Sequence, residues 1–273
     1  MGIRSLALSA VGIILAVALD TARPWSLPQG TAVKDAGPRT YRFAMDYTAA
    51  DIRGQVTHRQ RVEAAYTRGL PGGDVVWNNV SVAEADGASA PLGEPRKRAF
   101  MEGLRYRKSP TTMDETMKPE FFKNAPPTAI LERNLVWDEE ALEMFGQTQF
   151  EHLKLNEPYR LFSAQTVDMP GIGTFQNRDL QLTWTGRSHR NGQDCAVIDY
   201  RAYFNPLAIS NGGMNLTGRS HYWGQIWVAL ATKQVEYATL YEDVLGEMKL
   251  PGQDTPQLID IFRSGVLQPL AQR

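Results

Sequence analysis

Large apolar side chains alternate with polar ones in several segments of this chain, and a period of two is typical of half-buried strands. The clearest example is 41–47, where every second residue is large and apolar. Turn signals follow at 51–54 and 70–73, so the first strands should form an antiparallel meander. The same pattern predicts strands over 41–47, 56–66, 75–83, 101–107, 179–190, 193–204, 216–230 and 235–244.

The centre of the chain has the composition of helices rather than strands. We expect one or two helices between residues 113 and 153, and the clearest is 138–153, whose apolar residues lie near one helical face. Asp138 is placed to act as the N-cap of this helix. A further short helix is expected over 257–264.

These elements describe an α+β fold that is mainly antiparallel β. We predict a curved, half-barrel-like meander sheet with one or two helices from residues 113–153. Residues 40–273 should form a single β-rich domain that carries those helices as an insert. The Pro- and Gly-containing segment 19–39 should be a flexible lead-in, and 1–18 a signal peptide.

The first residues of the chain have the layout of a secretory signal. Arg4 precedes an apolar run from Leu6 to Leu19, and Ala16 and Ala18 form a small-x-small cleavage site. The run is short for a membrane span, and the alternative is an uncleaved N-terminal anchor. We therefore expect an exported protein, in the periplasm, outside the cell or held at a membrane.

Charge and cysteine content exclude several classes of protein. The net charge is −1 at pH 7, which argues against nucleic acid as a partner because such binding needs a strong basic excess. Cys195 is the one cysteine, so disulfides within the chain and CxxC metal sites are excluded. Its apolar neighbours predict a buried, inert thiol. No nucleotide-binding or cofactor-binding motif is present, and we expect no cofactor.

One nonapeptide occurs twice: 185–193 reads TGRSHRNGQ and 217–225 reads TGRSHYWGQ, with seven of nine positions identical and the copies 32 residues apart. Asn191 and Gly192 predict a tight hairpin after the first copy. In a meander the two copies would run parallel with one strand between them, about 9.6 Å apart. In each copy the serine should face one side of the sheet, and the arginine and histidine the other.

Three interpretations of this repeat follow. Its charged residues could simply be solvated, or the two histidines could hold Zn²⁺, but no third ligand is visible and we predict no metal site. The third interpretation is a cationic and aromatic patch that binds an amphiphile with an acidic head group. Its residues would be Arg187, His189, Arg219, His221, Trp223 and Trp227.

Catalytic chemistry finds little support in the sequence. Ser188-His189 and Ser220-His221 lack the G-x-S-x-G pattern of a nucleophile elbow, and adjacent strand residues face opposite sides. A cluster of acids suggests paired carboxylates for glycoside hydrolysis, but charges at a helix N-terminus explain it more simply. These acids are Asp138, Glu139, Glu140 and Glu143. We predict no catalytic residue.

The segments NGQDCAVI (191–198) and GQIWVAL (224–230) resemble hairpins of the half-barrel family of periplasmic lipoprotein carriers and outer-membrane lipoprotein-sorting proteins. The resemblance covers residues 175–250. It implies a curved sheet packed round helices, with a concave face that binds acyl chains.

The function expected from the sequence is therefore an exported, non-enzymatic envelope protein that binds an apolar or amphiphilic, lipid-like ligand. Two alternatives stay open. One is an exported hydrolase that uses the Arg/His patch or an acid pair. The other is an adaptor that binds another envelope protein through a sheet edge.

Overall fold

A computed structural model of the chain describes residues 26–27, 33–35, 37–109, 111–162, 165–169, 171–211, 213–252 and 255–271. The signal peptide expected over 1–18 lies outside these residues, as does most of the lead-in expected over 19–39. In the described part of that lead-in, Leu27 is buried and Asp35 forms an ion pair with Arg68. These residues therefore pack against the domain that follows.

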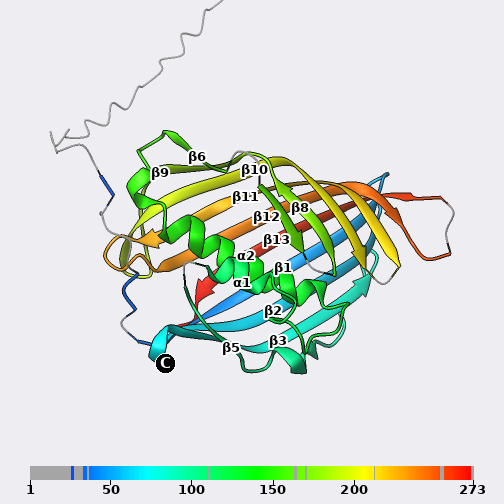
Figure 1. The fold of residues 1–273 in the computed structure, drawn as a ribbon, viewed down its shortest axis with the longest axis horizontal. Helices are drawn as coiled ribbons and strands as arrows, with labels where there is room; N and C mark the ends of the chain where they lie inside the picture. Colours follow the sequence, from blue (N-terminus) through cyan, green and yellow to red (C-terminus); the bar gives the residue numbers. More distant parts are fainter. Residues whose placement is uncertain are drawn as a thin grey trace, which may run out of the picture.

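Within the described residues, thirteen strands form one continuous, curved antiparallel sheet (Figure 1). The strands are β1 (Arg39–Asp51), β2 (Val56–Leu70), β3 (Asp74–Asp86), β4 (Arg96–Lys97), β5 (Leu104–Arg107), β6 (Pro158–Phe162), β7 (Gln165–Met169), β8 (Gly173–Asn177), β9 (Leu180–Arg190), β10 (Gln193–Asn211), β11 (Met214–Ala229), β12 (Val235–Lys249) and β13 (Gln257–Pro269). The α+β, mainly antiparallel fold expected from the sequence is confirmed.

The order of the strands joins the two ends of the domain. The main path runs β4-β3-β2-β1-β13-β12-β11-β10-β8-β7, with β5 beside β3 and with β9 and β6 continuing from β10. The first and last strands are therefore neighbours. They pair along 11 residue positions, from Tyr41 opposite Pro269 to Asp51 opposite Ile259.

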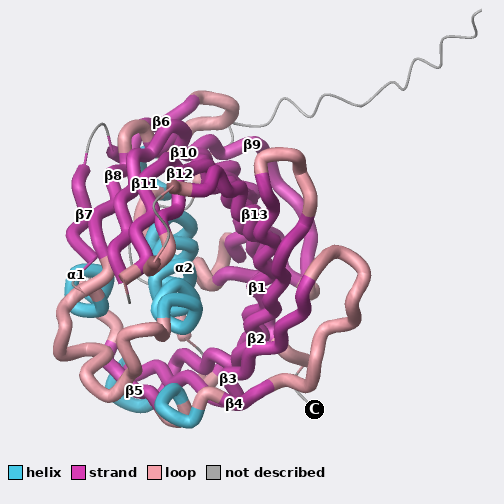
Figure 2. Tube along the Cα trace, turned by 90° about the vertical axis from the view of Figure 1, so that its right-hand side faces the viewer, coloured by secondary structure: helices cyan, strands magenta, loops and turns pink. Residues whose placement is uncertain are grey.

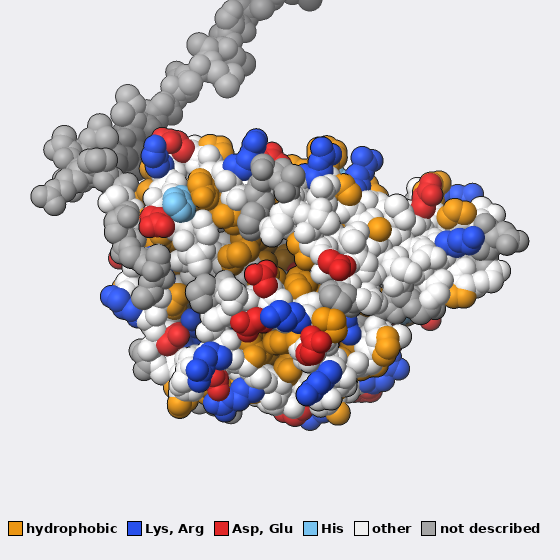
Figure 3. Space-filling model, in the orientation of Figure 1, with side chains coloured by type: hydrophobic (Ala, Val, Ile, Leu, Met, Phe, Trp, Pro, Cys, Tyr) orange, Lys and Arg blue, Asp and Glu red, His pale blue; other side chains and the backbone are white. Residues whose placement is uncertain are grey.

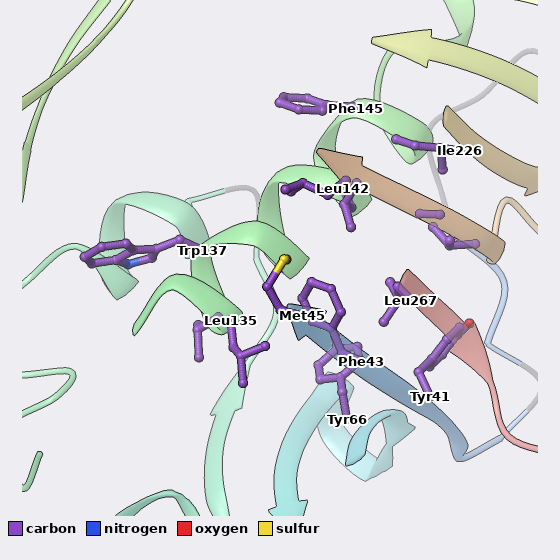
Figure 4. Packing of buried hydrophobic residues seen from close by; sticks show 14 of the residues in the cluster. Tyr41, Phe43, Met45, Tyr66, Leu135, Trp137, Leu142, Phe145, Ile226 and Leu267 are labelled. Carbon is purple, nitrogen blue, oxygen red and sulfur yellow. The ribbon is translucent and has the colours of Figure 1, made fainter. Parts of the chain in front are cut away.

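The alternation in the sequence sets which side chains face the inside of the curve. In β1, Tyr41, Phe43, Met45 and Tyr47 are buried, and the residues between them are only partly buried. They pack against side chains of α2 such as Leu142 in one large apolar core (Figure 4). Each strand predicted from its alternation is present, and most extend beyond the predicted ends.

Two α-helices are described, α1 (Thr112–Thr116) and α2 (Ile130–Gln147), together with 3-10 turns at Pro71–Gly73, Ala99–Met101 and Phe150–His152. The helix α2 runs inside the curve of the sheet (Figure 2). The predicted helix 138–153 was right in type but wrong in its bounds, so Asp138 is an internal residue and no N-cap. None of the described helices is long and apolar enough to cross a membrane.

A glycine in the last turn of α2 allows the helix to approach the sheet closely. A Cβ atom on Gly146 would lie 3.0 Å from methyl carbons of both Ile226 and Val228 on β11. Glycine normally weakens a helix, but here a larger side chain would force α2 away from the sheet. The close approach explains why a residue of low helix propensity occurs in this helix.

Two parts of the fold were not foreseen. The segment 257–264, predicted as a helix, begins the strand β13, in which Arg263, Gly265 and Leu267 alternate inward. Because Arg263 is charged and yet faces inward, the sequence of this strand does not show the usual alternation of apolar and polar residues. The short strands β4, β6, β7 and β8 were missed altogether.

Candidate ligand-binding site

A cavity of about 860 Å³ lies between α2 and the inner face of the sheet. We call it the inner cavity. Its walls are formed by α1, α2, the β7–β8 hairpin and inward-facing residues of β10 to β13. On the surface, Figure 3 shows a hollow lined by hydrophobic side chains and bordered by charged ones, on the face where α1 and α2 lie in Figure 1.

The apolar wall of the inner cavity is rich in methionine. Six of the nine methionines of the chain line it: Met113, Met117, Met144, Met169, Met214 and Met248. Aliphatic and aromatic side chains from several strands complete this wall, including Phe175, Leu207, Ile209, Leu216 and Ile261. Because methionine is unbranched and polarizable, such a wall can adapt to apolar molecules of different shape.

A cluster of buried charges also lines the inner cavity, where α2 meets β12 and β13. Arg263 donates hydrogen bonds from Nη1 and Nη2 to the two carboxylate oxygens of Asp138, each at 3.1 Å. The Nε atom of Arg263 lies 2.5 Å from Oε2 of Glu242, and Nη1 also donates to the Tyr47 hydroxyl at 3.3 Å. We call these four residues the Arg263 cluster. Its guanidinium is already bound on three sides.

The second copy of the repeated nonapeptide supports this cluster from behind. Ser220 is fully buried, and its hydroxyl donates to Oε1 of Glu242 at 2.5 Å. Tyr222, two residues later on the same inner face, donates to Oδ1 of Asn177 at 2.6 Å. The serine of this repeat therefore orients a carboxylate, while His221 lies on the other face of the strand beside Phe204.

Burial changes the acidity of this cluster. Loss of solvent raises the pKa of Asp138 to about 6, although the adjacent Arg263 opposes the shift. The pKa of Arg263 itself lies well above its usual value, because attraction from Asp138 and Glu242 outweighs the effect of its burial. The cluster carries one positive and two negative groups when all are ionised. It therefore presents carboxylate oxygens, rather than a free cation, to the inner cavity.

A second set of buried charges lies along α2 outside the inner cavity. Lys108 places its Nζ 2.6 Å from Glu140 and 3.1 Å from both Glu139 and Glu143. Glu143 also pairs with Arg68. Of the acids predicted as a charge cluster at a helix N-terminus, Glu139, Glu140 and Glu143 are thus buried within α2, because the helix begins eight residues earlier than predicted.

The pKa values of two of these acids, Glu139 and Glu143, are shifted in opposite directions. Burial raises the pKa of Glu139 well above its usual value, and the nearby Glu143 adds to the rise. Burial acts on Glu143 as well, but Lys108 and Arg68 outweigh it and lower its pKa to about 2. Two carboxyl groups whose pKa values are shifted apart are typical of an acid pair. Neither of them lines the inner cavity, so the structure gives this pair no access to a substrate there.

The structure does not bring the six residues of the predicted binding patch together. Arg187 lies opposite Ala196 of β10, and Ala196 lies opposite Val228 of β11. Arg219 is nine residues from Val228, so the two arginines are roughly 30 Å apart along the strands rather than 9.6 Å. The predicted separation was wrong because the two copies pair with different parts of β10.

The six residues do not share one face of the sheet, and none of them lines the inner cavity. The four on β11 lie on its outer face, whereas a bulge in β9 places Arg187 and His189 opposite Ala196 and Asp194, on the face that Ala196 shares with the core. Arg187 and His189 are exposed, and His189 lies 3.1 Å from Asp194. Trp227 packs against Tyr237, and Arg190 lies over both rings. The other three, which lie farther along β11, are Arg219, His221 and Trp223. The pattern of these six residues therefore did not predict where the inner cavity lies. Their part in ligand binding stays a prediction.

Two further features of the described residues are the environment of Cys195 and the arrangement of potential metal ligands. Cys195 is buried, as predicted, and the loss of solvent raises the pKa of its thiol to about 11. No group of three or more His, Cys, Asp or Glu side chains among the described residues is arranged to hold a metal ion.

The residues that the sequence did not reveal are those of the Arg263 cluster and the methionine wall. One signal was available for Arg263. The alternation of Ile259, Ile261, Gly265 and Leu267 continues through position 263, which marks an inward-facing charge if 257–269 is taken as a strand.

No family model matches the sequence, and no curated protein matches it. Among solved structures, the chain is similar to a lipovitellin structure described under lipid–protein interactions. The TM-score is 0.43 and the identity 12%, over 87% of this chain and 26% of that one. The chain thus spans about a quarter of that protein.

Two bacterial structures align over most of their length but less well. A DUF1329 family protein from Desulfovibrio piger has a TM-score of 0.16 and 6% identity, over 87% of this chain and 88% of that one. A putative AttH from Nitrosomonas europaea has a TM-score of 0.18 and 10% identity, over 95% and 98%. These scores are too low to bear on function, which is argued from the inner cavity alone.

Proposed function

We propose that this protein is an exported, non-enzymatic envelope protein that binds one lipid-like amphiphile in the inner cavity. The observation that carries the proposal is a cavity of about 860 Å³ between a helix and a curved sheet, with six methionines in its wall. Pockets for small molecules commonly measure roughly 300–1,000 Å³ and are mainly apolar, with a few polar groups that fix orientation. The export part of the proposal rests on the N-terminal sequence.

The apolar wall can supply enough energy for useful affinity. Burying ten methylene groups contributes roughly 8 kcal/mol. Before the costs of association, that corresponds to a Kd on the order of 1 μM. The methionines allow chains of different length or branching to be held without one fixed shape. The inner cavity therefore suits a class of apolar chains better than a single rigid compound.

The Arg263 cluster indicates which head group fits. The guanidinium is held by Asp138, Glu242 and Tyr47, so a ligand carboxylate would have to compete with two carboxylates of the protein. A neutral or cationic head group that donates hydrogen bonds meets no such competition, because carboxylates accept them. Inside the cavity this favours a hydroxyl or amine head group over the acidic one that the sequence suggested.

Binding can be measured directly on the purified chain. Organic extraction and mass spectrometry should release a bound lipid, and a neutral fluorescent probe such as N-phenyl-1-naphthylamine should bind saturably. Monolaurin and dodecylamine should displace the probe at lower concentration than lauric acid. Extraction that yields no lipid, together with a probe that does not saturate, would remove the proposal.

A pair of variants on one strand connects this binding to the inner cavity. Met248→Trp fills part of the cavity from β12, whereas Leu245→Trp adds the same ring on the outer face, where Leu245 is 39% exposed. We expect the first change to weaken probe binding about tenfold and the second to leave it nearly unchanged. Met169→Trp on β7 provides a second filled cavity, should Met248→Trp not fold. Equal affinities of filled-cavity and control variants would place the ligand elsewhere.

A further inference from the structure

A second pocket lies on the outer face of the sheet, where β10 changes its partner strand. β10 pairs with β9 as far as Arg201, opposite Gln181, and with β8 from Leu207, opposite Phe175. The pocket at this junction measures about 440 Å³. It is lined by Arg160, Arg178, Asp179, Gln181, Arg201, Tyr203 and Phe204. We call it the seam pocket.

A β-bulge in β10 turns two aromatic rings outward at the seam pocket. Ala202 pairs with Tyr222 and Asn205 with Ser220, so Tyr203 and Phe204 together occupy the place of one residue. Because of this extra residue, both side chains lie on the outer face, where Tyr203 is 41% and Phe204 57% exposed. Two large rings are thus presented to solvent side by side.

The backbone at this bulge is strained. Phe204 has a φ of 57°, in the left-handed region that aromatic residues rarely adopt. The buried side chain of Asn205 holds the bulge: it donates to the carbonyls of Ala202 and Ser220 and accepts from the backbone N–H of Arg178. Strained residues that their surroundings hold in place often mark functional sites.

The charge around these rings is positive. Three arginines and one aspartate line the pocket, which gives a formal charge of +2. Arg160 pairs with Asp179 at 2.7 Å, and Arg201 donates to the side chain of Gln181 at 3.2 Å. Within the described residues, neither Arg178 nor Arg201 forms an ion pair with a carboxylate. Two guanidinium groups therefore remain able to bind an external anion.

We propose that the seam pocket docks the protein on an anionic phospholipid membrane. Phe204 and Tyr203 would enter the interfacial layer, where aromatic rings are favoured, and Arg178 and Arg201 would bind lipid phosphates. Binding of a dissolved phosphate ion would involve the arginines, but it would leave the exposed rings of Tyr203 and Phe204 without a contact. An acidic protein surface would normally bury rings of this size within a flat interface, whereas the bulge makes them project. The proposal does not depend on what the inner cavity binds.

The test compares vesicles of phosphatidylcholine alone with vesicles that also contain phosphatidylglycerol, in a flotation assay with the full chain. Each arginine near an anionic surface changes affinity roughly fivefold, so the double change Arg178→Gln and Arg201→Gln should weaken binding about 25-fold. Phe204→Asn should weaken it about tenfold through the lost ring. Since asparagine tolerates a positive φ, the thermal midpoint of this variant should equal or exceed that of the wild type.

Matched controls lie in the β1–β2 turn, where Ile52 is 68% exposed and Arg53 is exposed beside it. Ile52→Asn and Arg53→Gln should leave vesicle binding unchanged. The proposal is overturned if the wild type does not float with anionic vesicles, or if the seam and control variants bind alike. It is also overturned if inorganic phosphate at buffer concentration abolishes binding, or if an acidic protein is captured without any association with vesicles.

Discussion

Asp138 and Arg263 face each other across the boundary between helix and sheet, with little solvent to screen them. Their side chains are 13% and 10% exposed. For such a pair, the loss of hydration opposes the attraction between the charges, and the balance decides the protonation state. The pKa of Asp138 near 6 shows that burial outweighs the effect of the single arginine that Asp138 shares with Glu242.

This balance predicts how stability depends on pH. The pKa of Asp138 rises from 3.8 to about 6 on folding, so between these values the native state binds more protons than the unfolded state. Its protonated form stabilises the fold fully below about pH 4, and this contribution is lost as the pH rises through 6. Because one pKa unit corresponds to about 1.4 kcal/mol, the full effect reaches about 3 kcal/mol.

The measurement is urea denaturation of the wild type and Asp138→Asn at a series of pH values. The difference in the free energy of unfolding, wild type minus variant, should fall between about pH 4 and pH 7 and then level off. Asp46→Asn, which removes an exposed ion pair with Arg61, should give a small and nearly constant difference. A difference for Asp138 that grows with pH would show that Arg263 dominates instead.

Single residues were predictable in orientation but not in position along the sheet. Alternation alone assigned Ser220 to one face and Arg219 and His221 to the other, and the burial of Ser220 agrees with this. The distance between Arg187 and Arg219 depends on which residues of β10 each strand pairs with. That register arises between strands, so no pattern within either copy of the repeat could reveal it.

At the level of elements, α2 is unusual because carboxylates are buried on more than one side of it. Glu132 pairs with Arg98, Asp138 with Arg263, and Glu143 with Lys108 and Arg68. Each pairing joins the helix to a different part of the surrounding fold. The helix is therefore held within the sheet by specific charge pairs as well as by apolar packing, and those pairs fix its rotation about its own axis.

Glu139 and Glu143, one turn apart on α2, should respond differently to substitution by glutamine. Burial and the nearby Glu143 raise the pKa of Glu139 well above its usual value, so a neutral glutamine matches the form that burial favours, and we expect Glu139→Gln to change the free energy of unfolding by less than about 1 kcal/mol. Glu143 is ionised and is the carboxylate that Lys108 and Arg68 share, so Glu143→Gln removes one negative charge from both buried cations. We expect it to destabilise the fold by about 3 kcal/mol.

Guanidinium denaturation at neutral pH compares the two variants, which differ from the wild type by the same atoms one helical turn apart. Equal destabilisation would mean that the proton is shared differently between the two carboxyl groups. A larger effect of Glu139→Gln would reverse the assignment.

The same buried charges explain which elements the sequence could not reveal. Strands such as β1 alternate cleanly and were predicted, because their inward residues are apolar. In β13 and α2, residues such as Arg263 and Glu139 occupy inward positions. A method that equates charge with the surface assigns those positions to the wrong face, so it misplaced the start of the helix and mistook the last strand for a helix.

For the whole molecule, the cavity depends on contacts between residues far apart in the chain. Its lining extends in sequence from Tyr47 to Arg263, and β13 lies between β1 and β12. Such a fold has many contacts between distant residues, and chains of this kind fold slowly because long loops must close first. We therefore expect the inner cavity to form only after β13 has paired with β1.

Truncation separates the role of β13 from that of the end of the chain. A chain that ends at Pro251 lacks β13 and leaves β1 and β12 without their shared neighbour, together with the partners of Asp138 and Glu242. A chain that ends at Pro269 keeps β13 and loses, among the described residues, little more than the hydrogen bond from Leu270 to the Thr40 carbonyl. We expect the shorter chain to show no cooperative urea transition and to aggregate through its unpaired strand edges. The longer one should unfold within about 1 kcal/mol of the full chain. If the chain ending at Pro251 keeps both a cooperative transition and saturable binding of the neutral probe, the inner cavity does not require β13 to join β1 to β12, and the ligand is held by the remaining strands and α2.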